Sequence, residues 1–180
     1  DLFSLYKFAT MLENSPNLAG GDITSGGDPR VLPVGKLLRK TKLNELPQLL
    51  NILIGDMSFV GQRPLTPQNF AFYQKETQDR LKLFKPGLTG VGSVIFRDEE
   101  SIIQNSKLET LDCYKYEISP YKGILEVWFI EKQNLLNYFI LIIITVWVVI
   151  FPNSKLLWRV FSDLPKPPFC LKNSIVFNRI

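Results

Sequence analysis

One uncharged apolar segment, residues 135–151, constrains the fold of this chain most. It reads LLNYFILIIITVWVVIF and carries no charged side chain across seventeen residues. A membrane-spanning helix needs about 20 apolar residues, so the segment lies at the lower limit for a span. Three environments are open to it: the protein core, a lipid-contacting surface and a full span. We expect a helix packed at the membrane interface, and a buried core helix is the main alternative.

The residues around this segment favour the interface. Trp128, Trp147 and Trp158 flank or interrupt it, and tryptophan prefers the headgroup region of a bilayer. Basic side chains near its ends, such as Lys155 and Arg159, are suited to meet lipid phosphates.

Composition limits the chemistry that the chain can perform. Its 180 residues suit one domain, residues 1–180, and its net charge of +4 is compatible with anionic lipid or phosphate substrates. The chain has no histidine, which removes the usual general base and the commonest metal ligand. Any metal ion must therefore be a hard ion held by oxygen. Cys113 and Cys170 match no zinc or redox spacing and are expected to be unpaired thiols in a reducing compartment.

Short local patterns predict the remaining elements. We expect a strand at residues 2–8, a mobile loop at 14–29, a helix from Thr66 to about Leu83, a strand at 91–96 and a helix at 108–116. Thr66-Pro67 is a good cap and first-turn pair.

Residues 35–64 form the most informative stretch for function. Leucines at positions 43, 46, 49, 50 and 53 recur at helical spacing and predict a helix over residues 44–54 with one apolar face. Pro47 is tolerated only in the first turn, which places the N-cap close to Asn44, and Gly55 supplies a stop.

Asn44 and Glu45 are then expected at the positive end of a helix, where anions bind favourably. Lys36, Arg39, Lys40, Lys42 and Arg63 surround this position in the sequence. The ensemble predicts a pocket for a phosphorylated substrate. An ordinary helix start explains Asn44 and Glu45 too, and on these residues alone that structural interpretation is favoured.

A longer series of motifs resembles the bacterial sugar transferases of the monotopic phosphoglycosyl transferase type. The resemblance covers residues 3–151. The matching pieces, in family order, are YKFATM (6–11), DPRV (28–31), VGKLLRKT (34–41), ELPQL (45–49), GDMSFVG (55–61), RP (63–64) and KPGLTG (85–90). The segments FRDEE (96–100) and SPYK (119–122), the latter leading into Thr145, resemble a subgroup of the family.

The resemblance implies a fold and a reaction. The fold is an α/β domain, a small sheet surrounded by helices, resting on the cytoplasmic face of the bacterial inner membrane. The reaction moves a phospho-sugar from a UDP-sugar to polyprenyl (undecaprenyl) phosphate and releases UMP, with Mg²⁺ offsetting phosphate charge. It begins exopolysaccharide, O-antigen or glycoconjugate synthesis. The implied partners are the UDP-sugar, the lipid phosphate and membrane lipid, with no nucleic acid, and a homo-oligomer stays open.

The resemblance also implies roles for individual residues. Glu45 matches the family's glutamate and is expected to bind Mg²⁺, and Arg39 matches an arginine that supports the catalytic pair. The other matching positions are Lys7 near the site, Arg63 and Arg97 near the nucleotide or phosphate, and Asp112 as a further acid of the site. Without the resemblance, each of these is best explained as a structural or solvated charge.

Two residues depart from the family pattern. Asn44 stands where the family has its nucleophilic aspartate, and an amide is a poor nucleophile towards phosphorus. Either another group such as Glu45 attacks, or the chain is a non-catalytic relative that binds nucleotide-sugar, lipid or a partner, or the residue was altered deliberately. Gln62 replaces a proline before Arg63. The resemblance places the family's membrane-inserting helix and first strand before Asp1, so we expect the chain as given to lack both.

Overall fold

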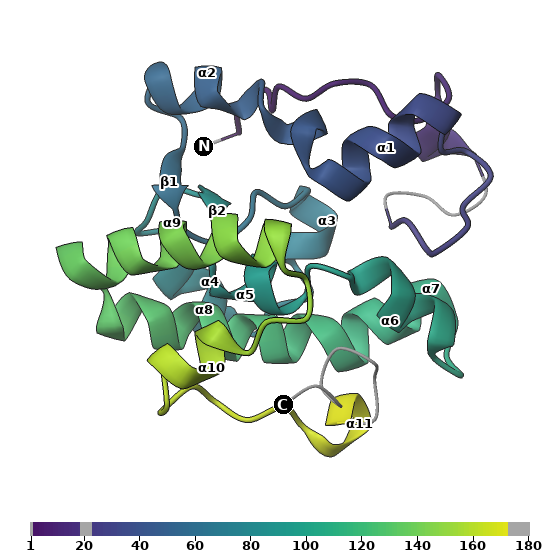
Figure 1. Ribbon diagram of the computed structural model, residues 1–180. Helices are drawn as coiled ribbons and strands as arrows, with labels where there is room; N and C mark the ends of the chain where they lie inside the picture. Colours follow the sequence, from purple (N-terminus) through teal and green to yellow (C-terminus); the bar gives the residue numbers. More distant parts are fainter. Residues whose placement is uncertain (1, 19–22, 173–180) are drawn as a thin grey trace.

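The protein consists of two helical layers with a very small sheet between them. The computed structural model describes residues 2–18 and 23–172. Helices α1 (Pro33–Thr41) and α2 (Gln48–Leu53) form the upper layer in Figure 1, and α8 (Ser119–Lys132), α9 (Leu135–Ile150) and α10 (Leu156–Val160) form the lower one. This arrangement bears out the expected small sheet surrounded by helices.

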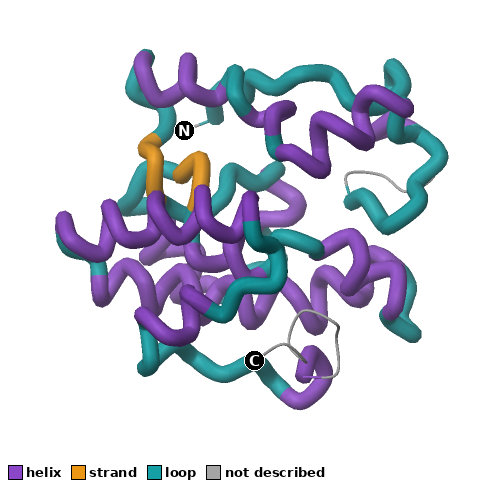
Figure 2. Tube along the Cα trace, in the orientation of Figure 1, coloured by secondary structure: helices purple, strands orange, loops and turns teal. Residues whose placement is uncertain are grey.

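The sheet has two parallel strands, β1 (Ser58–Val60) and β2 (Gly87–Thr89), drawn in orange in Figure 2. Ser58 pairs with Gly87 and Val60 with Thr89. The crossover between the strands carries α3 (Pro67–Phe70) and α4 (Lys75–Leu81). Parallel strands need such a connection, because a tight turn can only join antiparallel ones.

The remaining helices are short. In chain order they are η1 (Ser15–Asn17), η2 (Leu43–Glu45), α5 (Val91–Ile95), α6 (Glu99–Asn105), α7 (Thr110–Asp112), the π-helix η3 (Cys113–Ile118) and α11 (Phe169–Lys172). The core lies where α8 packs against α5 and α9, and its fully buried members include Val91, Leu125 and Leu141.

Helix α9 confirms the predicted helix at residues 135–151, and it is buried on one face only. Leu141, Ile144 and Val148 point into the core. The Tyr138 hydroxyl accepts hydrogen bonds from the backbone N–H groups of Phe59 and Val60, at 3.1 and 3.3 Å. These bonds dock α9 onto β1.

The opposite face of α9 is apolar and exposed. We call this set of side chains the outer face of α9: Leu135, Leu136, Phe139, Ile143, Val146, Trp147 and Ile150. No helix in the described part of the chain combines the length and the apolar character needed to cross a bilayer. The helix thus contributes to the core with one face and leaves a contiguous apolar stripe on the other.

The helix predicted over residues 44–54 is borne out only from Gln48 to Leu53. Residues 43–45 form the 3₁₀ turn η2, and α2 begins only at Gln48, with Pro47 at its N-cap. The leucine face points outward, and Leu53 is 80% exposed. The polar face is buried instead, with Gln48 3% and Asn51 0% exposed.

Three other expected elements differ from the structure. Residues 91–95 form helix α5 and not a strand, because short apolar runs have no periodicity that separates the two. Residues 2–8 form no strand, since the backbone N–H groups of Tyr6 and Phe8 bond to Asn51 Oδ1 and the Asn44 carbonyl. The helix expected from Thr66 breaks into α3 and α4, although Thr66 does cap it, accepting from the Asn69 N–H.

The remaining expectations have mixed outcomes. The helix at 108–116 is borne out by α7 and η3 together, and both cysteines are free thiols. Part of the expected loop at 14–29, residues 19–22, lies outside the described residues.

Candidate functional site

A large groove separates the upper layer from the lower one. Its volume is about 1820 Å³, and α1 and η2 line it from above while α3, α5, α6 and α10 contribute from below. Six of the seven predicted site residues line this groove: Lys7, Arg39, Asn44, Glu45, Arg63 and Arg97. Asp112 does not. It is exposed on α7, because the turn into η3 directs Cys113 and Tyr114 inward instead.

Glu45 forms the centre of the site together with Arg63. The Glu45 side chain is 11% exposed, and its Oε1 lies 2.6 Å from Arg63 Nη2. Arg63 lies three residues after the end of β1, and the Gln62 carbonyl before it accepts from the Gly87 N–H of β2, while Glu45 lies in η2. The pair places one fixed negative and one fixed positive charge on the wall of the groove.

Asn44 lies in η2 and is not the N-cap of a helix. Its side chain makes no cap hydrogen bond, and α2 has only six residues. The expectation that a helix tip attracts anions here is therefore wrong, and positive charge at the site comes from side chains. The Asn44 carbonyl holds the N-terminal segment by accepting from the Phe8 N–H at 3.0 Å.

The side chain of Asn44 has an unused acceptor. Asn44 is 9% exposed, and its Oδ1 is buried without a hydrogen-bond partner among the described residues. A buried acceptor left unpaired costs about 1–3 kcal/mol, so such atoms are rare away from binding sites. Its place on the groove wall makes this oxygen a position that a ligand's donor or a cation can satisfy.

Asn51 is one of two residues, together with Lys122, whose part in this site was not predicted from the sequence. Its Oδ1 accepts from the Tyr6 N–H at 3.0 Å, and its Nδ2 donates to the Ser4 carbonyl at 2.8 Å. These bonds fasten the segment that carries Lys7 to the inner side of α2. The signal was present, because Asn44, Gln48 and Asn51 recur at helical spacing and form a polar stripe.

Basic residues cluster on α1 and at its end. Lys36, Arg39 and Lys40 line the groove from α1. Lys42 follows in a left-handed conformation (φ 60°), and desolvation and the neighbouring Arg63 lower the pKa of its amine. The Arg39 Nε donates to Glu100 Oε1 on α6 at 3.2 Å, which ties the two layers together across the groove.

Arg97 is engaged by the protein itself. Its Nη1 donates to the Val148 carbonyl and its Nη2 to the Val149 carbonyl, the latter at 3.3 Å. These carbonyls belong to the last turn of α9, where carbonyl groups have no N–H donor within the helix. Burial lowers the pKa of this guanidinium. Arg97 thus lines the groove and also caps α9.

A further ion pair closes the deep side of the groove. Lys122 on α8 pairs with Glu99 on α6, and its ammonium lies 5.3 Å from the ring centroids of both Phe96 and Tyr114. Sequence reasoning did not single out Lys122 as a site residue. Only the packing of α8 against α6 brings it to the groove.

The donor atoms fit a magnesium ion that shares its ligands with phosphate. Among the described residues, no group of three Asp, Glu or Cys side chains is arranged to hold a metal ion by itself. The buried carboxylate of Glu45 and the unpaired Oδ1 of Asn44 are both hard oxygen donors on the groove wall. Mg²⁺ commonly binds through one or two carboxylates together with substrate phosphates and water.

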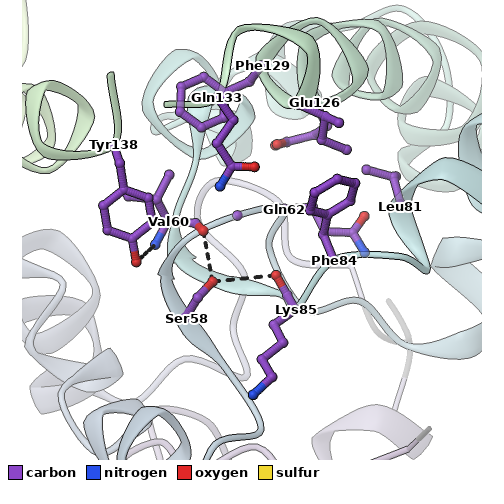
Figure 3. A pocket seen from close by; sticks show the side chains of 12 residues that line it. Ser58, Val60, Gln62, Leu81, Phe84, Lys85, Glu126, Phe129, Gln133 and Tyr138 are labelled. Atoms are coloured by element: carbon purple, nitrogen blue, oxygen red, sulfur yellow. Dashed lines mark hydrogen bonds between the residues drawn. The ribbon is translucent and has the colours of Figure 1, made fainter. Parts of the chain in front are cut away.

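A second, smaller cavity lies behind the sheet (Figure 3), with a volume of about 160 Å³. Glu126 on α8 lines it, and its Oε1 accepts from the Gly92 N–H at 3.2 Å. Burial raises the pKa of Glu126 to about 7. Gln62 lines both this cavity and the groove, and its Oε1 has no partner among the described residues.

Comparisons with known proteins show the family of this chain. The sequence model of the family described as bacterial sugar transferase matches residues 1–152. An undecaprenyl-phosphate galactose phosphotransferase of Salmonella typhimurium is 39% identical over 112 residues, 54% of this chain and 23% of that protein. The uncharacterized sugar transferase EpsL of Bacillus subtilis is 34% identical over 135 residues, 73% of this chain and 55% of that protein.

A UDP-galactose-lipid carrier transferase of Erwinia amylovora is 32% identical over 162 residues, 82% of this chain and 30% of that protein. The chain thus spans about a quarter to a half of the length of these relatives. The family match covers most of the chain and includes every predicted site residue that lines the groove. The chain belongs to the bacterial sugar transferase family.

Proposed function

We propose that this chain transfers a phospho-sugar from a UDP-sugar to polyprenyl phosphate and releases UMP, at the cytoplasmic face of the bacterial inner membrane. One observation carries the proposal: the groove brings the Glu45–Arg63 pair, Asn44 and the cations of α1 to one wall. The printed names of two relatives point the same way, since one is an undecaprenyl-phosphate galactose phosphotransferase and another a UDP-galactose-lipid carrier transferase.

The charges of the groove suit a sugar diphosphate. Phosphoryl transfer depends on positioning and on stabilising charge at the phosphate oxygens. The Arg63 side chain is 44% exposed, and a guanidinium can form paired hydrogen bonds to phosphate oxygens. Lys36 and Lys40 on α1 are exposed and make no ion pair among the described residues, so they are available to a second phosphate.

Glu45 and the Asn44 amide oxygen would hold the magnesium ion. The bound ion would offset the negative charge of the diphosphate. Arg63 holds the Glu45 side chain in place, because its Nη2 donates a hydrogen bond to Glu45 Oε1 at 2.6 Å.

The outer face of α9 supports membrane contact. It presents an apolar stripe with Trp147 near one end, and Arg159 is exposed on the following helix α10. Contiguous exposed apolar surface of this kind is typical of interaction sites. A helix that lies in the interface plane would place the groove within reach of a lipid phosphate.

The proposal is tested by UMP release. Membranes containing the protein receive Mg²⁺, undecaprenyl phosphate and a panel of UDP-sugars. We expect slow, acceptor-dependent UMP release, and we expect Asn44→Asp to raise the rate at least about tenfold, which is 1.4 kcal/mol of activation free energy. Glu45→Gln should abolish the Mg²⁺-dependent part of the UMP release.

The matched control for this assay is Glu131→Gln. Glu131 is an exposed carboxylate on α8 that pairs with Arg80, so the variant should release UMP at the rate of the natural chain. Unchanged activity in Glu45→Gln would remove the metal role of that residue.

The alternative is a binding module without turnover. Asn44 favours it, because the residue at the nucleophile position is an amide. Binding of a UDP-sugar without UMP release, in both the natural chain and Asn44→Asp and across the panel, would establish this function in place of the enzymatic one.

A further inference from the structure

Among the described residues, every carboxylate that lines the groove has a partner within the chain, except the exposed Glu13. The six described carboxylates that line the groove are Glu13, Asp28, Glu45, Asp98, Glu99 and Glu100. Four of them are ion-paired within the chain, to Arg30, Arg63, Lys122 and Arg39. Asp98 accepts a hydrogen bond from the Ser101 hydroxyl at 2.7 Å, and Glu13 is exposed to solvent beside η1.

The other nucleophile types are no better placed. The Ser93 hydroxyl lines the groove, but it is buried without a hydrogen-bond partner among the described residues, so no base activates it. Cys113 is buried within η3 and does not line the groove, and burial raises the pKa of its thiol. A covalent phospho-sugar intermediate therefore has no prepared attachment point on the described residues.

The groove has room and charge for two phosphate ligands at once. Its volume of about 1820 Å³ exceeds the roughly 300–1,000 Å³ of ordinary ligand pockets. Among the basic residues that line it, Lys42 and Arg63 lie close to Glu45, and Lys36 and Lys40 line it from α1 without an ion pair among the described residues.

We infer that this chain holds the UDP-sugar and the polyprenyl phosphate together in one ternary complex, and that the lipid phosphate attacks directly. The inference rests on the proposed function and deepens it. A lipid phosphate oxygen forms a bond to the phosphorus that carries the sugar. The bond from that phosphorus to the bridging oxygen of UMP breaks, and the electron pair leaves with UMP. The side chains of the protein position the two substrates and neutralise their phosphate charge, and no side chain becomes phosphorylated.

Two measurements on the whole chain test this inference. The first is calorimetric binding of UDP-galactose with and without saturating farnesyl phosphate, a soluble polyprenyl phosphate. We expect the Kd of UDP-galactose to change less than threefold. The inference is overturned if the Kd of UDP-galactose rises in proportion to the concentration of farnesyl phosphate, or if neither probe binds. Both outcomes can be observed without any turnover of substrate.

The second measurement is exchange of labelled UMP into UDP-galactose without any lipid acceptor. A covalent route catalyses this exchange, and direct attack does not. We expect no exchange and no phospho-sugar mass increment on the natural chain, and exchange with Asn44→Asp, which restores a carboxylate. Exchange by the natural chain, or an adduct on Glu45 or Lys42, refutes direct attack. If no UMP is released in the presence of both substrates, the proposed function is refuted. The ternary complex is tested separately, by the binding measurement.

Discussion

Glu126 provides the sharpest test of the physical description of this fold. The carboxyl group is 5% exposed, lies between α8 and the start of α5, and has one neutral donor in the Gly92 N–H. Lys122 on the same helix favours its ionised form, but burial outweighs this and raises the pKa to about 7. Replacing Glu126 with glutamine keeps a side-chain oxygen that accepts from the Gly92 N–H and removes the group that titrates.

The size of the effect follows from the two states of the carboxyl group. Its pKa is about 7 in the folded chain and 4.5 when unperturbed, which corresponds to about 3 kcal/mol at 1.36 kcal/mol for each pH unit. Because the folded state binds the proton more tightly, stability is greatest below pH 4.5 and falls as the pH rises to about 7. Above that pH the loss is complete and constant.

The assay is urea unfolding of both proteins between pH 4.5 and 8. The free energy of unfolding of the natural chain should fall by about 3 kcal/mol relative to Glu126→Gln over this interval. Glu131→Gln, an exposed change on the same helix, should parallel the natural chain. A constant difference between the natural chain and Glu126→Gln at all pH values would refute the burial argument (Figure 3).

Three further changes test the local interactions. Asn51→Ala should lower the free energy of unfolding by about 2 kcal/mol, measured by urea unfolding, because it leaves the Tyr6 N–H and other backbone groups unpaired. Tyr138→Phe should cost about 1 kcal/mol in the same assay, since α9 loses its acceptor for two strand N–H groups. Ile143→Asp should weaken sedimentation with anionic lipid vesicles while leaving the melting temperature unchanged, and Ile124→Asp, an exposed change on α8, should leave both unchanged. Equal loss of vesicle binding in the two isoleucine variants would contradict a specific role of the outer face of α9.

The sequence predicts long-range features of this chain best where one strong signal dominates. Residues 135–151 form one long uncharged apolar segment, for which a helix was expected, and α9 is that helix. The groove residues were predicted from motifs whose members lie far apart in the sequence, and six of seven meet in space. The exception, Asp112, sits one residue before η3, where the π-helical turn shifts the direction of the side chains.

Helix α2 shows why local periodicity misleads. Its leucines and its polar stripe have the same helical spacing, so periodicity alone does not decide which face is buried. Asn51 is buried because it bonds to residues 4 and 6, a contact across more than forty positions that no local pattern contains. The exposed leucines of α2 and the outer face of α9 share this property: each is apolar, and neither is needed for the core.

The roles of the arginines also depend on tertiary contacts. Arg39 and Arg63 bond to glutamates, while Arg97 bonds to carbonyls at the end of α9. All three appear in the sequence as equivalent basic residues near a phosphate site. Only the fold shows that Arg97 links the end of α9 to the groove.

UMP release from a UDP-sugar is the measurement that tests the central claim most directly. Membranes containing the natural chain, Mg²⁺ and a panel of UDP-sugars should release UMP only when undecaprenyl phosphate is added, and Arg63→Gln should reduce the rate at least about tenfold because the groove loses the guanidinium beside Glu45. If neither the natural chain nor Asn44→Asp releases UMP with any UDP-sugar, or if release is equally fast without the lipid phosphate, transfer at this groove is contradicted.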